Sequence, residues 1–428
     1  MRVRRGGTST AVALCGTLLL AACGPTAPDA GHATPTRIAD APARLPVPHG
    51  KGSRTPDDFN GDGHRDLVLD DLVKEQRHAD DAGIGIVYGG PHGLTPGARQ
   101  LLSPKKQAAP TKGQLPAVFG AEESCDLDGD GFTDLIVSTD PPYDGQGRPP
   151  VPLQILFGSP AGLTGRAVRL TVPDRARFGN DWPDQPVCGD FDGDGKKDLV
   201  LHASGGRLSY LRGPFSRKGA PRAAGAPLPS PGEVPTGPAA DVDGDGYDDL
   251  VVRSAEGTGT SAVVLGGPAG PTRTGAVLPA GTDVALGRFG RGRALDAAVG
   301  GTGETSLRYD LPAAARAGLA APGSLLDTAD FDGDGRDELV SSASRVRLFR
   351  AGTAGLSTKG ALTVVPPAPG TTRVLAAGDF DGDGRADLVV RTYRGETRDT
   401  VAVYRGTKRG LLEAKPAVTF SSSAFLAP

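Results

Sequence analysis

The stretch Asp379-Phe380-Asp381-Gly382-Asp383-Gly384-Arg385-Ala386-Asp387-Leu388 places four carboxylates within nine residues and interleaves two glycines. Its pattern, Asp-x-Asp/Asn-Gly-Asp-Gly-x-x-Asp/Glu-Leu, occurs six times, beginning at Asp58, Asp126, Asp190, Asp241, Asp330 and Asp379. Recurrence of this kind is typical of repeat architectures, in which each copy forms one supersecondary unit. This repeat decides the fold.

Each copy is predicted to hold a metal ion. Carboxylates at positions 1, 3 and 5 of a tight turn can converge, glycines at positions 4 and 6 permit the turn, and position 7 offers its backbone carbonyl. A carboxylate at position 9 closes the cage. The oxygen set favours Ca²⁺ at about six sites; it argues against zinc or copper, and magnesium prefers stricter geometry. The alternative is a set of solvated acidic turns. The predicted ligands are Asp58, Asn60, Asp62, His64 and Asp66; Asp126, Asp128, Asp130, Phe132 and Asp134; Asp190, Asp192, Asp194, Lys196 and Asp198; Asp241, Asp243, Asp245, Tyr247 and Asp249; Asp330, Asp332, Asp334, Arg336 and Glu338; and Asp379, Asp381, Asp383, Arg385 and Asp387.

The loops are not of the EF-hand type. That loop needs a bidentate glutamate at position 12 and flanking helices. Position 12 holds no acidic residue in any copy; it is Leu69, Val137, Leu201, Val252, Ser341 and Val390. Runs such as Leu-Val-Val follow position 9 and favour strands. The acidic loops are therefore expected to join strands.

A second signature follows several loops, as in Ile86-Val87-Tyr88-Gly89-Gly90-Pro91 and Ile155-Leu156-Phe157-Gly158-Ser159-Pro160. Together with the acidic loops it resembles the FG-GAP (VCBS-type) repeat of integrin-α-like β-propellers, from about residue 57 to residue 428. A degenerate copy at residues 287–296 keeps only Asp296, and no metal is expected there. Seven units predict an all-β, seven-bladed propeller of four-stranded antiparallel blades, which the resemblance also implies. The segment Ala424–Pro428 is expected to supply the inner strand of the first blade.

The amino-terminal segment reads as an export signal. Arg2, Arg4 and Arg5 precede a short apolar stretch that ends in Leu20-Ala21-Ala22-Cys23, which resembles the lipobox of bacterial lipoproteins. The resemblance implies a signal peptide at residues 1–22, lipid on Cys23, and a location on the outer face of the bacterial cell membrane. An ordinary signal peptide is the alternative. Residues 23–52 are rich in Pro, Ala, Gly and Thr, which predicts a flexible tether, with the propeller at residues 53–428.

Two cysteines, Cys125 and Cys188, remain once the first two of the four are assigned to the signal and the lipid. In an exported, oxidising setting they are expected to form a disulfide, the alternative being two free buried thiols.

A ligand site is expected away from the acidic loops. The longest connections of the first blades carry Tyr143, Arg148 and the single tryptophan, Trp182, which suit a cell-surface glycan or protein partner. Packing of Trp182 between blades is the alternative. The formal net charge of −3 does not indicate nucleic acid; loss of residues 1–22 and binding of six Ca²⁺ would bring it to about +6.

Functionally, the sequence favours a binding, adhesion or scaffold module over an enzyme. It contains no GxSxG, HExxH or P-loop motif. Of its six histidines, two lie in the tether, one in an acidic loop and two in predicted loops of the first blade, and His202 has no evident catalytic partner. A polysaccharide lyase or hydrolase on a propeller fold is the alternative.

Overall fold

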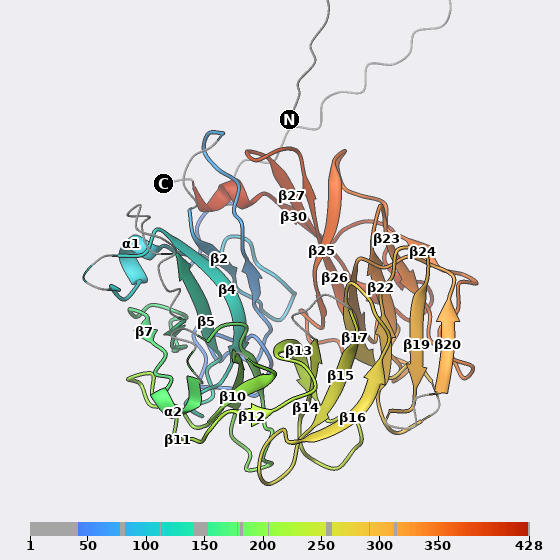
Figure 1. Cartoon of the computed structure of the whole chain (residues 1–428). Helices are drawn as coiled ribbons and strands as arrows, with labels where there is room; N and C mark the ends of the chain where they lie inside the picture. The colour runs from blue at the N-terminus through green and yellow to red at the C-terminus, as the bar shows by residue number, and fades with distance from the viewer. Residues whose placement is uncertain are drawn as a thin grey trace, which may run out of the picture. The chain divides into compact units, whose positions relative to one another are not determined.

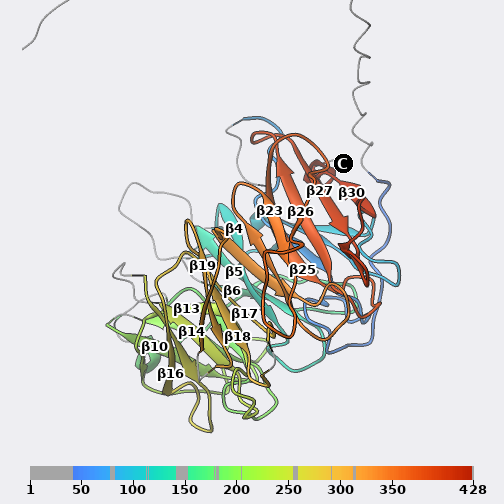
Figure 2. The ribbon, with the colours of Figure 1, turned by 90° about the vertical axis from the view of Figure 1, so that its right-hand side faces the viewer.

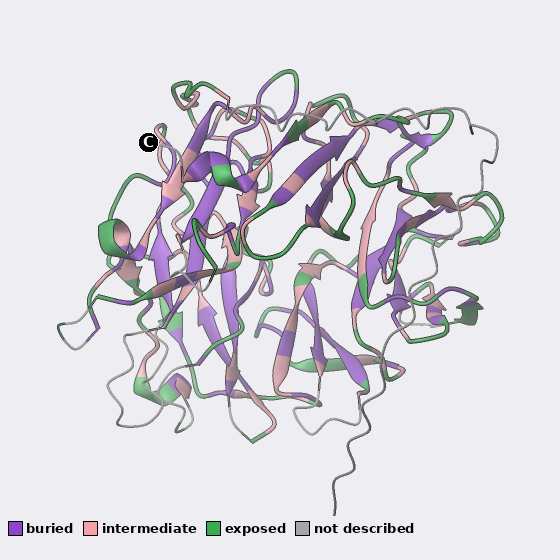
Figure 3. Ribbon diagram, turned by 90° about the horizontal axis from the view of Figure 1, so that it is seen from above, coloured by how far each residue is buried: buried purple, intermediate pink, exposed green. Residues whose placement is uncertain are grey.

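The apolar runs that follow the acidic loops form the second strand of the later sheets and, in the first sheet, the strand at its inner edge, β1 (Leu67–Leu69). Nearly every residue of β14 (Asp249–Arg253) and β26 (Asp387–Tyr393) is buried, because a neighbouring sheet covers each of their faces. The computed structural model describes residues 42–77, 82–111, 113, 115–140, 153–177, 179, 183–203, 205–253, 259–290, 292–311 and 315–426. Figure 3 shows that buried residues predominate along many strands of the molecule.

Seven antiparallel sheets follow one another along the described chain (Figures 1 and 2). They are numbered here as blades 1 to 7. The strands of each blade are given from the inner to the outer edge. Blade 1 contains β1 (Leu67–Leu69), β2 (Ile84–Val87) and β3 (Arg99–Leu102), blade 2 contains β4 (Val118–Cys125), β5 (Asp134–Asp140), β6 (Gln154–Leu156) and β7 (Val168–Arg169), and blade 3 contains β8 (Val187–Gly189), β9 (Asp198–Ala203), β10 (Arg207–Arg212), β11 (Ala223–Ala224) and β12 (Leu228–Pro229). Blade 4 contains β13 (Val234–Ala240), β14, β15 (Ser261–Leu265) and β16 (Arg273–Leu278), blade 5 contains β17 (Val284–Gly287), β18 (Asp296–Val299), β19 (Thr305–Tyr309) and β20 (Ala315–Leu319), blade 6 contains β21 (Leu325–Ala329), β22 (Glu338–Ser342), β23 (Val346–Phe349) and β24 (Leu362–Thr363), and blade 7 contains β25 (Thr371–Gly378), β26, β27 (Asp399–Tyr404) and β30 (Val418–Phe420).

The expected seven-bladed propeller of four-stranded antiparallel blades is confirmed, with two local departures. Blade 1 contains three strands in the part of the chain described, and the outer strand of blade 3 is split into β11 and β12, which both pair with β10. The remaining elements are the hairpin of β28 (Gly406–Thr407) and β29 (Leu411–Leu412), two short helices, α1 (Pro104–Gln107) and α2 (Asp174–Arg177), and the 3-10 helix η1 (Ser422–Phe425). Within the described residues, no helix has the length and apolar character needed to cross a membrane.

Seven apolar cores, one between each pair of successive blades, hold the ring together. Each contains the residue at position 2 of one loop, and these residues are at most 1% exposed: Phe59, Leu127, Phe191, Val242, Phe289, Phe331 and Phe380. Burial of such a side chain contributes about 1.5–3 kcal/mol. The acidic loops are thus anchored in the interfaces between blades.

The ring closes between blades 7 and 1, where Leu67 and Leu69 pack with Val389 and Val401. The chain end does not form the expected inner strand of blade 1. Residues Ser422–Phe425 form the 3-10 helix η1, because Ser421 accepts a hydrogen bond from the backbone N–H of Ser423 and starts a helical turn. The expectation for Ala424–Pro428 was therefore wrong for residues 424–426, and residues 427–428 lie outside the described part.

Blade 1 begins differently from the other six, because its acidic loop is preceded by a segment that runs across the blade. The backbone of Leu45 bonds to Gly97, and those of Gly50 and Lys51 bond to Asn60 and Gly61 at 3.0 Å. Residues 42–52, expected to be tether, thus pack on blade 1, while residues 23–41 and Cys23 lie outside the described residues.

Candidate metal sites

The carboxylate at position 1 organises each acidic loop. In blade 2, Asp126 Oδ1 accepts the N–H groups of Gly129 (2.8 Å) and Asp130 (3.0 Å), and Oδ2 accepts that of Gly131 (2.9 Å). The loops that begin at Asp241, Asp330 and Asp379 repeat this arrangement. Gly129 and Gly131 have φ of +75° and +87°, a region that favours glycine. The two glycines of the repeat therefore serve the turn itself.

Positions 5 and 7 complete the turn and link it to its neighbour. In blade 2, Asp130 Oδ1 accepts the N–H of Phe132 at 3.1 Å, and the same contact recurs at His64, Lys196, Tyr247, Arg336 and Arg385. The side chain at position 7 lies over the position-4 glycine of an adjacent loop: Phe132 over Gly61, Lys196 over Gly129, Tyr247 over Gly193, Arg385 over Gly333 and His64 over Gly382. Successive loops therefore touch on one face of the ring, called here the loop face.

Five of the six acidic loops bring three carboxylates together, with one oxygen of each within 4.8 Å of the others. Four of them combine positions 1, 3 and 9, and the loop of blade 3 combines positions 1, 3 and 5. The groups are Asp126, Asp128 and Asp134; Asp190, Asp192 and Asp194; Asp241, Asp243 and Asp249; Asp330, Asp332 and Glu338; and Asp379, Asp381 and Asp387.

The first loop departs from this pattern because position 3 is an amide. Asn60 Nδ2 donates to Pro48 O at 3.0 Å and to Asp62 Oδ2 at 3.2 Å, while Ser53 donates to Asp58 Oδ2 at 2.6 Å. Asp58, Asp62 and Asp66 do not form a group within the 4.8 Å limit met by the other five loops. Blade 1 therefore has the weakest candidate site of the six.

Several oxygens in these loops are buried and have no hydrogen-bond donor among the described residues. They are Asp128 Oδ1, Asp190 Oδ1, Asp192 Oδ1, Asp332 Oδ1 and, in the first loop, Asn60 Oδ1. Buried polar atoms are nearly always satisfied, so oxygens that converge without a donor require another partner. A hard cation with an oxygen shell supplies such a partner, and the residues present fit one.

Position 9 has a structural role of its own. Asp134 Oδ2 accepts the N–H of Leu127 at 2.9 Å, and Oδ1 accepts that of Gly158 at 2.9 Å. The carboxylate thus ties its own loop to the end of the third strand. Asp66, Asp249, Glu338 and Asp387 make the equivalent pair of bonds, and Asp198 replaces one donor with the hydroxyl of Tyr210.

Burial makes these carboxylates hard to ionise in the metal-free chain. Desolvation, assisted by the other acidic ligands, raises the pKa of Asp66, Asp134 and Glu338 to about 8 against the backbone N–H bonds, which lower it. The pKa of Asp249 and that of Asp387 rise to about 7 for the same reasons. A bound cation would offset this cost, because it stabilises the ionised form.

The degenerate loop of blade 5 keeps the position-9 contacts. Asp296 Oδ2 accepts the N–H of Phe289 at 2.7 Å, and Oδ1 accepts that of Asp310 at 2.6 Å. Asp296 is 2% exposed, and burial raises its pKa. The retained carboxylate is therefore explained by these two hydrogen bonds.

Arginines that follow the third strands reach the position-3 carboxylates. Arg217 pairs with Asp128, Arg350 pairs with Asp332, and Arg405 Nε lies 3.2 Å from Asp381. These arginines were not expected from the sequence. Arg350 and Arg405 follow the third strand of the blade whose loop they contact, whereas Arg217 follows β10 of blade 3 and reaches the loop of blade 2. They partly neutralise the loops and stand at the edge of each candidate site.

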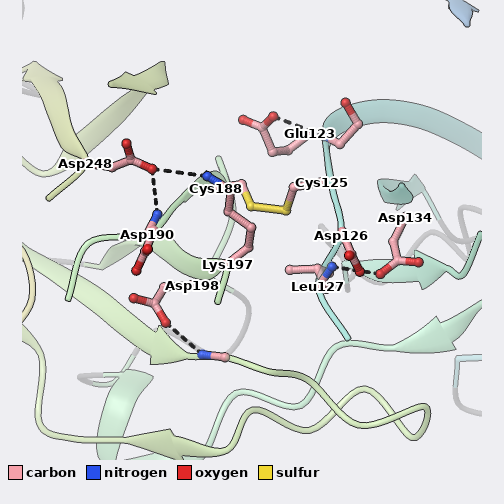
Figure 4. The surroundings of a disulfide bond; sticks show 12 residues. Glu123, Cys125, Asp126, Leu127, Asp134, Cys188, Asp190, Lys197, Asp198 and Asp248 are labelled. Atoms are coloured by element: carbon pink, nitrogen blue, oxygen red, sulfur yellow. Dashed lines mark hydrogen bonds and ion pairs between the residues drawn. A yellow bond between two sulfur atoms is a disulfide. The ribbon is translucent and has the colours of Figure 1, made fainter. Parts of the chain in front are cut away.

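A disulfide joins Cys125 at the end of β4 to Cys188 in β8, across blades 2 and 3 (Figure 4). Beside it, Lys197 Nζ lies 3.2 Å from Asp248 Oδ2, and Asp248 also accepts the N–H of Asp190 at 2.7 Å. The other expected ligand residues, Tyr143, Arg148 and Trp182, lie outside the described residues.

Comparison with known proteins supports the repeat. Residues 126–201 and 330–390 match the FG-GAP-like repeat. No curated protein matches the chain. Similar solved structures include an Agrocybe aegerita lectin described as recognising non-reducing terminal N-acetylglucosamine (16% identity, TM-score 0.41, 70% of this chain and 77% of that chain). Others are BBS1N in complex with ARL6DN (15%, 0.48, 87% and 97%) and the Dos1 propeller (12%, 0.46, 89% and 91%).

The likeness to these solved structures carries no argument about function. The repeat match and the seven sheets agree with each other, since two of the matched acidic loops lie in blades 2 and 3 and another two in blades 6 and 7. The chain is a seven-bladed β-propeller that contains FG-GAP-like repeats.

Proposed function

We propose that this protein is an exported, lipid-anchored, calcium-binding propeller that acts as a non-catalytic binding, adhesion or scaffold module at the outer face of the bacterial membrane. The supporting observation is the set of acidic loops in which buried oxygens such as Asp128 Oδ1 and Asp332 Oδ1 converge without a donor. Ca²⁺ prefers carboxylate and carbonyl oxygens in a flexible shell, which is what these loops offer.

Calcium would act on the fold through the interfaces between blades. Each loop carries its metal-facing carboxylates next to a buried position-2 side chain, as Asp330 and Asp332 flank Phe331. A cation held by positions 1, 3 and 9 would fix the loop and, through it, the apolar core between two blades. Binding to the folded state alone raises stability with cation concentration, by about 2.7 kcal/mol per site at a hundred times Kd.

The calcium proposal is tested by titrating Ca²⁺ into chelator-treated protein in a calorimeter and by following the melting temperature in parallel. We expect several bound ions per chain and a melting temperature that rises with Ca²⁺ but much less with Mg²⁺. Absence of bound calcium together with an unchanged melting temperature in EGTA would refute it.

The membrane anchor rests on the sequence around Cys23, which resembles a lipobox. Replacement of Cys23 by serine is expected to move the protein from the detergent phase to the aqueous phase in a phase-partition experiment on cell extracts. Equal partition of the two proteins would exclude the anchor while leaving the calcium sites untouched.

A further inference from the structure

A cavity of about 1110 Å³ is lined by residues of blades 1, 2 and 3, including parts of their acidic loops, and by Pro238 and Ala239 of β13 in blade 4. One wall is formed by residues 51–57, which cross blade 1 in place of an inner strand and bond to blade 2 through Ser53 N–H and Gly131 O at 2.7 Å. The rest of the lining includes the end of β4, the loops of blades 2 and 3, and the Cys125–Cys188 disulfide, whose surroundings are drawn in Figure 4. The cavity is large enough for a small oligomeric ligand.

Three of the cations that line the cavity have no counter-ion among the described residues. Lys51, Arg54 and Lys196 are exposed, and none of them forms an ion pair there. The other two cations are engaged: Arg65 Nη2 lies 2.8 Å from Asp57 Oδ2, and Lys197 binds Asp248. Positive charge is therefore available at the mouth of the cavity.

The carboxylates that line the cavity each have another partner or belong to a candidate metal site. Asp57 is paired with Arg65, while Asp126 and Asp130 belong to the candidate metal site of blade 2 and would be neutralised by its cation. The remaining carboxylate, Glu123, accepts the N–H of Ser124 at 3.0 Å and also that of Cys188. In the metal-loaded protein the cavity therefore attracts anions.

The lining also limits the kind of anion. It contains no aromatic side chain, and its few apolar groups are Pro56, Pro238 and Ala239. Base stacking, which drives the binding of single-stranded nucleic acid, has no platform here. Exposed backbone groups and the Glu123 carboxylate suit hydroxyl groups, which donate hydrogen bonds.

We propose that this cavity binds an acidic saccharide, with its carboxylates facing Lys51, Arg54 and Lys196 and its hydroxyl groups facing the interior. The inference rests on the proposed binding function and names the site and ligand class for it. It places the site on the loop face, whereas the sequence pointed to Tyr143, Arg148 and Trp182.

The test uses the full chain, purified in detergent and saturated with Ca²⁺, in a calorimeter with trigalacturonate and with neutral maltotriose as probes. Trigalacturonate is expected to bind at least roughly tenfold more tightly than maltotriose, with an affinity that falls as salt is raised. The variant K51A/R54A/K196A should lose roughly tenfold in affinity, since each exposed ion pair contributes about two- to threefold. The variant K105A/K106A, in the exposed part of α1, is the matched control and should bind like the parent.

Two results would overturn the proposal that this cavity binds an acidic saccharide. One is equal binding of trigalacturonate by the triple variant and the control; the other is the absence of binding by a protein that Ca²⁺ still stabilises. The calcium titration of each variant separates these cases from failure of the proposed function, in which the parent neither binds nor is stabilised by Ca²⁺. The same titration shows whether the triple variant is folded.

Discussion

Replacing Arg391 with methionine tests how the ring closes. Arg391 is 0% exposed, and its Nε donates to Asp399 Oδ2 at 2.7 Å. Its Nη1 and Nη2 donate to the carbonyls of Asp70 and Asp71, each at 2.8 Å, and Nη2 also donates to Ser422 Oγ. One side chain thus joins blade 7, blade 1 and the helix η1.

The expected cost of R391M is large because it leaves Asp399, which is 2% exposed, as a buried charge without its cation. Removing one partner of such a pair costs about 3–5 kcal/mol. The domain spans residues 42–426. A domain of roughly 385 residues has an unfolding entropy of about 0.8 kcal/mol/K, so the melting temperature should fall by about 4–6 °C. The assay is thermal unfolding followed by circular dichroism in saturating Ca²⁺.

Two further variants make this reasoning refutable. The double variant R391M/D399L removes both charges and should melt above R391M, since an apolar pair of similar volume replaces the ion pair without an orphaned charge. R409M, at an exposed arginine, should melt with the parent protein. If R391M melts with the parent, or the double variant melts below R391M, the closure does not depend on this contact.

Three other perturbations address the loops and the disulfide. C125S/C188S should lower the free energy of unfolding by about 4 kcal/mol in urea titrations, because the bond closes a loop of sequence separation 63; equal midpoints with and without a reductant would contradict this. D296N should lower the free energy of unfolding by about 1–3 kcal/mol, because it leaves a buried N–H without an acceptor, and the loss should be the same in Ca²⁺ and in EGTA. D134N should cause a similar loss and should also reduce the stabilisation by Ca²⁺. Burial raises the pKa of Asp134 to about 8, so the metal-free fold binds more protons than the unfolded chain between about pH 4 and 8 and loses stability as the pH rises through that window. The Ca²⁺-induced rise in melting temperature should therefore be larger at pH 8 than at pH 5. Equal rises at the two pH values in scanning fluorimetry would count against Asp134 as a calcium ligand.

The seven-bladed ring follows from sequence because each unit carries its own local signals. Glycines with positive φ mark every acidic turn, and the apolar run after position 9 marks the buried strand. The apolar residue at position 2 is a further local signal. Phe289 in the degenerate loop occupies the same kind of core as Phe331 and Phe380, so it identifies the seventh unit without any metal ligand.

The closure could not be derived in the same way. The apolar residues of Ala424-Phe425-Leu426 suit a strand or a helix equally. The capping serine, Ser421, is the local signal that favours the helix. Two of the partners of Arg391, the carbonyls of Asp70 and Asp71, lie more than 300 residues away in sequence. Contacts of that kind depend on the completed ring.

The two hydrogen bonds of the position-9 carboxylate have an evolutionary consequence. Blade 5 lacks the carboxylates of positions 1, 3 and 5, yet Asp296 still accepts the N–H groups of Phe289 and Asp310 and so ties the loop to its sheet. Repeats of this kind are therefore better counted in sequences by an aromatic or aliphatic residue followed seven positions later by an acidic residue than by the full acidic signature. Surveys that require every ligand will undercount blades and truncate domain boundaries.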